Sequence, residues 1–500
     1  MNPAERQIFD SAPLEHLDSF YIGGQWVPAT SGKSIDVIDS TNEEVYYSAA
    51  DASAEDMDRA ISAARDAFDH GPWPRMTHQE RADHLHRLAD ALRKRMPRMA
   101  EIWPRETGIV FDMAYEDLIR QPNVIDRYAD MADTFPWQER YDTTWGGEYG
   151  LLVQEPVGVV AAIITWNGPM ALIAYKCSPA LIAGCTVVIK MPPESPASAY
   201  LFAEAVEEAG LPAGVVNFVT AADTEVSKML VADPRVDKIT FTGSSEVGRQ
   251  IAGVASQRFA RYTLELGGKS AAVLFDDADI EQAALNLTGA QCYLTGQVCA
   301  ALTRIIVPRQ KHDRMVELMV DAFSRLRVGD PFDPESQIGA LSTERHLQRV
   351  LGYVETGKKE GAVLATGGGR PAHLEKGFYV EPTIFANVNN SSVIAQEEIF
   401  GPVLCVIPSD SEDHAIELAN QSRYGLNAAI FTKDVDVARK AATRLRSGTV
   451  GHNAFRADFG IAFGGVKDSG VGREGGIEGL RAFLETKTLV LDGIPSDGPR

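Results

Sequence analysis

Apolar residues follow two patterns along this chain, a helical repeat of three or four positions and short continuous runs typical of strands. After Ser53, which is followed by acidic residues, apolar residues recur three or four positions apart, and this predicts an amphipathic helix that ends near Gly71. A second helix is predicted from about His78 to Ile102. Pro97 should interrupt that helix or mark its end, because proline lacks an N–H and clashes with the preceding turn.

From Glu155 onward, short β-rich runs alternate with helical patterns. Residues 157–164 are apolar throughout, which is typical of a strand covered on both faces. Further strands are predicted at 186–189, 215–219 and 238–241, with helices at 171–183 and 197–209. The alternation predicts βαβ units and a parallel sheet, and its return from Ala271 to about Phe431 predicts a second α/β unit.

Composition narrows the class of protein. The 500 residues include 48 Lys plus Arg and 69 Asp plus Glu, a formal charge of −21 that argues against binding to nucleic acid or to an anionic membrane. The longest apolar stretch is about half of the ~20 residues that a membrane span needs, and the first residues do not resemble a secretory signal. Five cysteines in no CxxC cluster predict a reduced, cytoplasmic protein with no metal site.

Candidate chemistry begins where predicted strands end. Strand 239–241 is followed by Thr242-Gly243-Ser244, which opens a helix, and glycines at a helix N-terminus can accept a phosphate. Taken alone, such a segment is more often an ordinary turn, and the GxGxxG fingerprint of dinucleotide sites is absent.

Three further residues could take part in catalysis. Cys299 follows a glycine-containing connection, although a lone cysteine is more often inert packing. Glu265 stands between two leucines, where burial would raise its pKa, but a surface salt bridge is the ordinary alternative. Asn167 follows the buried strand at 157–164 and could equally close its own turn.

Together and in this order, these segments clearly resemble the aldehyde dehydrogenase superfamily. The matching motifs are TWNGP, KCSPALIAGCTVVIK, FTGSSEVGR, LELGGKS, GQVCAA, QEEIFGPVL, YGLNAAIFT and FGGVKDSGVGRE. The resemblance runs from about Phe20 to Leu491, nearly the whole chain. It implies an NAD(P)-dependent, non-acylating enzyme that oxidises an aldehyde to a carboxylic acid.

The resemblance also implies a catalytic role for five residues. Cys299 is expected to attack the aldehyde, giving a thiohemiacetal and then a thioester. The Asn167 side chain and the Cys299 N–H are expected to stabilise the oxyanion, and Glu265 to activate water. Lys176 and Glu474 match a proton-relay pair of the family.

For the cofactor, the resemblance implies NAD, with NADP not excluded. The residues expected to contact it are Ile164, Thr165, Trp166, Lys190, Gly243, Ser244, Val247, Leu266, Glu398 and Phe400. The sequence departs from many relatives at Pro193, which stands where an acid commonly binds the ribose hydroxyl, and Glu194 is next along. A loop that usually contains glycine is Thr220 to Thr224 here, so the contacts on the adenosine side are open.

The expected substrate pocket is apolar. It would be lined by Gly168, Met170, Leu172, Tyr175 and Phe463, and Gly168 replaces a ring that many relatives have. A medium or bulky aldehyde, terpenoid or aromatic, is therefore expected. One alternative is a semialdehyde or betaine-aldehyde substrate. A CoA-acylating enzyme is another, and the presence of Glu265 argues against it. A non-catalytic protein of the same fold is the last, and the presence of Cys299, Glu265 and Asn167 argues against it. The directions of Arg456 and Asp458, in the lining segment 454–462, are open.

The architecture implied is α/β, with two open parallel domains, a Rossmann-like cofactor domain and a catalytic domain, and a small β oligomerisation arm. The expected ranges are 1–134 and 153–266 for the NAD-binding domain, 267–479 for the catalytic domain, and 135–152 with 480–500 for the arm. A homodimer or homotetramer is expected, with a small aldehyde as partner and no nucleic acid or membrane.

Overall fold

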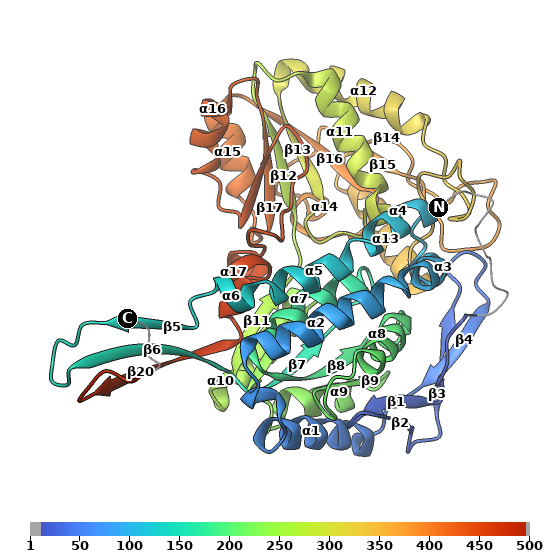
Figure 1. Cartoon of the computed structure of the whole chain (residues 1–500). Helices are drawn as coiled ribbons and strands as arrows, with labels where there is room; N and C mark the ends of the chain where they lie inside the picture. Colours follow the sequence, from blue (N-terminus) through green and yellow to red (C-terminus); the bar gives the residue numbers. More distant parts are fainter. Residues whose placement is uncertain (1–11, 497–500) are drawn as a thin grey trace.

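Two mostly parallel sheets, each flanked by helices, form the body of the molecule (Figure 1). The structure is a computed structural model that describes residues 12–496; residues 1–11 and 497–500, which the expected domain ranges include, lie outside the described residues. The predicted α/β class is confirmed. Within the described part, no helix is long and apolar enough to cross a membrane.

The first sheet has six strands in the order β19-β11-β10-β7-β8-β9. Five of them are parallel, namely β7 (Val159–Ile163), β8 (Thr186–Met191), β9 (Val216–Thr220), β10 (Lys238–Thr242) and β11 (Arg261–Glu265). The connecting helices are α7 (Pro169–Ala183), α8 (Ala197–Glu208), α9 (Thr224–Ala232) and α10 (Ser245–Gln257). The strand order reverses between β7 and β10, and ligands of open sheets bind at such a crevice.

The N-terminal helices agree with the pattern, with one difference. Helix α1 (Ala54–Asp69) begins with a capping box in which Ser53 and Asp56 satisfy each other's backbone N–H groups. The second predicted helix is two helices, α2 (His78–Arg93) and α3 (Met96–Thr107). Pro97 lies in the first turn of α3, where a missing N–H costs nothing. The shorter α4 (Phe111–Leu118), α5 (Gln121–Ala129) and α6 (Met131–Thr134) follow.

The second sheet has seven strands in the order β14-β15-β16-β13-β12-β17-β18. Its strands are β12 (Ser270–Leu274), β13 (Leu302–Pro308), β14 (Val363–Thr366), β15 (Thr383–Ala386), β16 (Val403–Ser409), β17 (Asn427–Phe431) and β18 (Thr449–His452). All neighbours pair in parallel except β14 with β15. The predicted second unit therefore extends beyond Phe431, because β18 adds an edge strand.

Both faces of this second sheet are buried. Ala271 and Val273 of β12 belong to one apolar cluster, whereas the alternating Ala272 and Leu274 belong to another. The covering helices are α11 (Ile280–Cys292), α12 (His312–Ser324), α13 (Glu344–Lys359), α14 (Val393–Gln396), α15 (Glu412–Asn420) and α16 (Val435–Ala442).

A three-stranded antiparallel sheet projects from the body (Figure 1). It consists of β5 (Gln138–Tyr141), β6 (Tyr149–Pro156) and β20 (Leu484–Leu491), and α17 (Gly476–Arg481) precedes β20. Strand β6 continues four residues past the expected arm boundary at 152. The chain also returns to the first sheet, where β19 (Gly470–Val471) pairs with β11. The division into domains stays a prediction.

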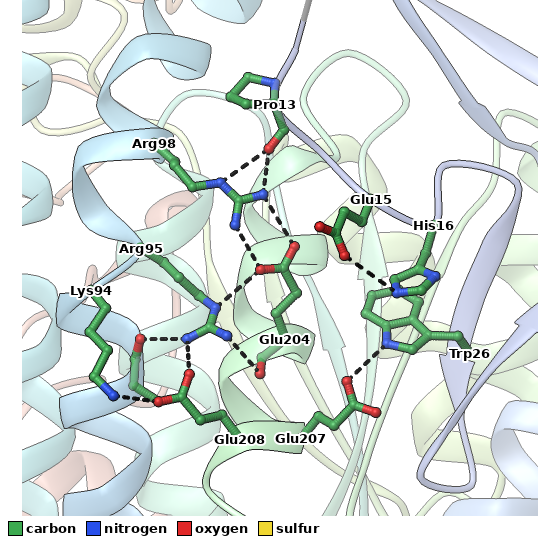
Figure 2. Close-up of polar contacts among 11 residues, drawn as sticks. Pro13, Glu15, His16, Trp26, Lys94, Arg95, Arg98, Glu204, Glu207 and Glu208 are labelled. Carbon is green, nitrogen blue, oxygen red and sulfur yellow. Dashed lines mark hydrogen bonds and ion pairs between the residues drawn. The ribbon is translucent and has the colours of Figure 1, made fainter. Parts of the chain in front are cut away.

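Partly buried arginines connect the N-terminal segment to the first unit, as Figure 2 shows. Arg98 donates to the Pro13 carbonyl (3.1 Å) and pairs with Glu204 of α8 at 2.9 Å. Arg95 also pairs with Glu204, at 3.2 Å. These contacts bring α3 and α8 together beside the hairpins β1 (Ser19–Ile22) with β2 (Gln25–Pro28) and β3 (Ser34–Ile38) with β4 (Val45–Ala50).

Candidate active site

The loop before Cys299 has an unfavourable backbone. Leu294, Thr295 and Gly296 have φ values of 49°, 55° and 73°, so two residues with side chains occupy the left-handed region in succession. Gly339 donates a backbone hydrogen bond to Thr295 Oγ1 at 3.3 Å, one of the contacts that hold the loop. Such a conformation persists only where its surroundings determine it.

Gln297 is the main anchor of this loop. Its buried side-chain amide donates to the carbonyl oxygens of Thr107 (3.2 Å) and Leu294 (3.1 Å) and accepts from the Ser342 N–H (3.0 Å). Its backbone carbonyl accepts from Asn167 Nδ2 at 3.0 Å. Asn167, from the turn after β7, is thereby fixed beside the cysteine loop, and an amide NH₂ has a second N–H left to donate.

Glu265 is the last residue of β11 and is buried. Neither of its carboxylate oxygens accepts a hydrogen bond from the described residues. Burial raises the pKa of Glu265 well above its ordinary value; the negative charge of Glu474 adds to the rise, and the cations Lys176 and Arg473 oppose it. A carboxyl group of this kind can take up a proton at neutral pH.

The Cys299 thiol faces the same opening as Glu265. Burial raises the pKa of Cys299 to about 12, with further increases from the charges of Glu398 and Glu265. The backbone N–H groups of Cys299 and Ala300 act in the opposite direction on this pKa, so both lie near the sulfur. The resting cysteine is therefore a thiol, and it requires a base to become a nucleophile. Of the five free cysteines, Cys177, Cys185 and Cys405 are fully buried.

Behind Glu265, Lys176 and Glu474 form a fully buried ion pair. Lys176 Nζ donates to Glu474 and, at 3.2 Å, to Thr240 Oγ1. Glu474 comes from the segment before α17 and is held by a two-way backbone bridge to Phe463 (2.6 and 2.7 Å). The predicted pair is thus in contact, and it lies within electrostatic reach of Glu265.

A cavity of about 560 Å³ between the two sheets is lined by Asn167, Glu265 and Cys299, but not by Lys176 or Glu474. Its lining consists of Thr165, Trp166, Asn167, Thr242, Gly243, Ser244, Glu265, Leu266, Gly267, Cys299, Thr343, Arg345, His346, Arg349, Glu398 and Phe400. Most of the predicted cofactor residues are in this list. Ile164, Lys190 and Val247 are not, and the backbone N–H of Ile164 donates to the Lys190 carbonyl at 3.0 Å.

Glu398 is one of the residues that line the cavity. One of its oxygens accepts from the Gly268 N–H at 3.1 Å, and burial raises the pKa of Glu398 to about 7. An added Cβ at Gly267 would stand 2.5 Å from the other oxygen, so only glycine permits this approach. A partly free, buried carboxylate at this point can accept hydrogen bonds from the hydroxyl groups of a ribose.

An aromatic wall flanks Glu398. The rings of Trp166 and Phe400 meet edge to face at 5.4 Å, and His346 packs on both, at 5.4 and 5.8 Å. His346 Nε2 is 2.6 Å from the Phe400 carbonyl, and burial lowers the pKa of His346 to about 4. The sequence did not point to His346 and Arg349, because α13 is far from every motif along the chain. Folding alone brings this helix to the cavity.

Three residues expected on the adenosine side, or next to it in sequence, lie outside the lining of the cavity: Lys190, Glu194 and Val247. Ser244 caps α10 by accepting from the Val247 N–H at 3.3 Å, and Val247 is 41% exposed, an apolar surface open to a flat ring. Burial lowers the pKa of Lys190, and the charge of Glu194 opposes this. Glu194 also lies 3.5 Å from Arg345.

The region expected to bind substrate contains stacked rings. Tyr175 stacks on Phe459 (4.4 Å, 29°), and Phe459 stacks on Phe463 (4.2 Å, 20°). Phe459 and Phe463 belong to an apolar cluster that includes Cys299. An added Cβ at Gly168 would meet no atom of the described residues within 4 Å, so this position faces open space. Leu172 is half-buried.

Three other residues of that region do not belong to the ring stack. Met170 is only 1% exposed and packs in the core of the first unit. Arg456 and Asp458 are exposed; the Arg456 carbonyl accepts from Asn427, and Asp458 closes its own turn by accepting from the Gly460 N–H. The sequence did not single out Phe459, because hydrophobic periodicity does not show which way the side chain of a loop residue points. Among residues 12–496, no group of His, Cys, Asp and Glu is arranged to hold a metal ion.

The comparison with protein families agrees with this geometry. Residues 26–489 match the model of the aldehyde dehydrogenase family. The chain belongs to the aldehyde dehydrogenase family. The family assignment confirms the predicted superfamily and class of enzyme, an oxidoreductase that acts on aldehydes.

Individual members of the aldehyde dehydrogenase family match over nearly the whole chain. A geranial dehydrogenase of Castellaniella defragrans is 40% identical, covering 96% of this chain and 100% of its own. A betaine aldehyde dehydrogenase of Bacillus subtilis is 37% identical, covering 96% and 98%. An aldehyde dehydrogenase of Mycobacterium tuberculosis, complexed with NAD+, superposes with a TM-score of 0.92 at 40% identity, covering 95% and 98%.

Proposed function

We propose that this protein oxidises a medium or bulky apolar aldehyde to its carboxylic acid with NAD as the electron acceptor. The observation that supports this substrate class is the open space at Gly168, next to Asn167, together with the ring stack of Tyr175, Phe459 and Phe463. Moving a long or cyclic hydrocarbon tail from water onto these rings lowers the free energy by about 25 cal/mol per Å² of apolar surface buried.

The cavity between the two sheets fits NAD. The α10 N-terminus with Gly243 and Ser244 suits a pyrophosphate, Val247 suits the adenine, and the free oxygen of Glu398 suits the nicotinamide ribose. When bound there, NAD supplies the hydride acceptor. Glu194, next to Pro193, is the acid of the loop after β8, and its charge acts on Lys190. A carboxylate there would repel the 2′-phosphate of NADP, so NADP is the weaker candidate.

In the mechanism that we propose, Glu265 takes the proton of the Cys299 thiol, and the thiolate adds to the aldehyde carbon. The oxygen becomes negative, and Asn167 Nδ2 and the Cys299 N–H donate to it. Hydride then leaves that carbon, giving a thioester on Cys299. Glu265 first passes the thiol proton toward Lys176 and Glu474 and, as a carboxylate again, deprotonates a water molecule that attacks the thioester, which releases the acid and frees the sulfur. The proton of the water follows the same path.

Substitution of the cysteine tests the reaction. Cys299→Ala is expected to lose aldehyde-dependent NADH formation, while the matched control Cys292→Ala, at a half-buried cysteine on the preceding helix, should retain it. Persistent activity in Cys299→Ala would contradict the assignment.

A panel of aldehydes tests the substrate class. The kcat/KM for citral and benzaldehyde should exceed that for acetaldehyde and succinic semialdehyde, with NAD and NADP compared in parallel. Preference for succinic semialdehyde would refute the apolar pocket. A second candidate is betaine aldehyde, because stacked aromatic rings also attract a quaternary ammonium group; preference for betaine aldehyde over citral would select it.

We also propose that the chain is cytoplasmic and assembles as a homodimer or homotetramer through the arm of β5, β6 and β20. Trp145 at the end of this arm is 97% exposed, and such a ring is seldom left in water. The five free cysteines suit a reducing compartment.

A further inference from the structure

Two side chains of α13 hold the backbone of the segment that contains Glu398. His346 Nε2 lies 2.6 Å from the Phe400 carbonyl oxygen, and Arg349 Nη2 donates to the Glu398 carbonyl at 2.8 Å. A carbonyl oxygen can only accept a hydrogen bond, so Nε2 of His346 carries the hydrogen. The two donors are three positions apart on α13 and therefore reach the segment from the same face of the helix.

The backbone of Phe400 needs such support. Its φ of 67° lies in the left-handed region, which a residue with a side chain rarely adopts. The buried ring of His346 packs edge to face on Phe400 (5.8 Å) and on Trp166 (5.4 Å). A strained conformation persists only where its surroundings determine it, and the hydrogen bond from His346 together with these ring contacts supplies that constraint.

The same segment lies against the cysteine loop. An added Cβ at Gly296 would stand 2.7 Å from the Gly401 carbonyl carbon and from the Pro402 nitrogen, so the two backbones are in contact. Just before α13, the Ser342 N–H donates to the Gln297 side chain of that loop at 3.0 Å. Helix α13 and the residues that lead into it therefore hold both the cysteine loop and the segment packed on it.

His346 adds no charge to this wall at neutral pH. Burial lowers its pKa to about 4, the hydrogen bond to Phe400 opposes this, and the charges of Arg349 and Arg345 add to the fall. An imidazolium here would repel the positively charged nicotinamide ring of NAD+. A neutral ring whose N–H points at a carbonyl supports Phe400 without that repulsion.

We propose that His346 and Arg349 are positioning residues for NAD: by holding the carbonyls of Phe400 and Glu398, they fix the nicotinamide end of the cofactor relative to Cys299. This inference rests on the proposed placement of the nicotinamide ribose beside Glu398. Loss of either hydrogen bond should weaken cofactor binding and leave the KM for the aldehyde unchanged.

Hydrogen–deuterium exchange of the enzyme without cofactor tests the support of the backbone. His346→Phe keeps an aromatic ring but lacks the N–H, so the amides of residues 397–403 should exchange faster than in the parent. His346→Gln, whose amide can donate to the same carbonyl, should restore part of the protection. The matched control His70→Phe, at an exposed histidine after α1, should leave exchange in this segment unchanged.

Titration with NADH, followed by its fluorescence, tests the effect on the cofactor. The Kd should rise roughly three- to tenfold in His346→Phe, the size expected for one lost hydrogen bond, and the KM for NAD should rise with it. Arg349→Met, at an exposed position, should act in the same direction, and Arg349→Lys should recover part of the affinity. The arginine variants decide the outcome if substitution of the buried His346 prevents folding.

Three results would overturn the positioning role. The first is unchanged exchange in both His346→Phe and Arg349→Met. The second is faster exchange with an unchanged Kd for NADH, because the segment would then have no effect on the cofactor. The third is an equal loss in His346→Gln and His346→Phe, because the ring and not the donated hydrogen bond would then support Phe400. Neither exchange nor NADH titration involves an aldehyde, so an error in the proposed substrate class would leave both results unaffected.

Discussion

Glu265 combines burial, two unpaired oxygens and a nearby acid, and this combination has two measurable consequences. The first is kinetic. Glu265→Gln keeps the size of the side chain but cannot activate water, so deacylation should slow by at least about 10²-fold. Because Glu265 also takes the thiol proton in the proposed mechanism, the first turnover should slow as well, and stopped-flow mixing should show one slowly formed NADH per subunit followed by a nearly flat steady state. Steady turnover at the parent rate would exclude Glu265 as the base for water.

The second consequence concerns stability. In the unfolded chain Glu265 titrates near pH 4.5, whereas in the fold its pKa lies well above that value. Between these two values the folded state holds one proton more than the unfolded state, so stability falls as pH rises, by at most about 1.4 kcal/mol per pH unit.

Glu265→Gln removes this term. The Tm difference, variant minus parent, should therefore grow from pH 5 to pH 8, as calorimetry can measure. Glu478→Gln, on an exposed helix, is the control and should show no such trend. A difference independent of pH would mean that the Glu265 pKa is not raised.

At the scale of elements, the strained turn Leu294–Gly296 depends on Gln297. Gln297→Ala leaves the Ser342 N–H and the Thr107 carbonyl without partners, and each loss costs about 1–3 kcal/mol. We expect a free energy of unfolding lower by about 2–4 kcal/mol and a reduced kcat, because Cys299 and Asn167 lose their common support. Gln310→Ala, at an exposed glutamine, should change neither.

The pair Lys176–Glu474 joins α7 to the segment before α17. Lys176→Met leaves a buried carboxylate without its cation, and stability should fall by about 3–5 kcal/mol in denaturant titrations. The double variant Lys176→Met with Glu474→Gln should recover part of this loss. Lys487→Met, which breaks an exposed pair with Glu155, should cost less than about 1 kcal/mol.

At the scale of the whole molecule, the projecting arm of β5, β6 and β20 exposes three large apolar side chains. Tyr141, Trp145 and Val490 are 53%, 97% and 56% exposed on or beside β5 and β20. Replacing Trp145 and Val490 together by Asp should shift the enzyme to smaller species in light scattering, because charges in a buried interface are costly. Phe259→Asp, at an 85% exposed ring after α10, is the control. An unchanged mass in the arm variant would place the interface elsewhere.

Much of the fold was predictable because its signals are local. The apolar run at 157–164, the capping residue Ser53 and the βαβ alternation each depend on neighbouring residues, and strands β7, β8 and β10 lie within two residues of their predicted ends. The break between α2 and α3 was shifted because Pro97 is tolerated in a first turn. The edge strand β18 and the pairing of β19 with β11 depend on distant partners.

The sequence by itself determined the fold class, the family and the identity of the candidate catalytic residues. These depend on the order of the motifs and on the spacing of apolar residues, and both can be seen along the chain without its fold. The tertiary structure alone decided which groups meet. It showed Gln297 hydrogen-bonded to Asn167, His346 on the cavity wall, and Phe459 between Tyr175 and Phe463. Burial and the electrostatic field of neighbours depend on contacts across hundreds of residues, and these exist only once the chain has folded.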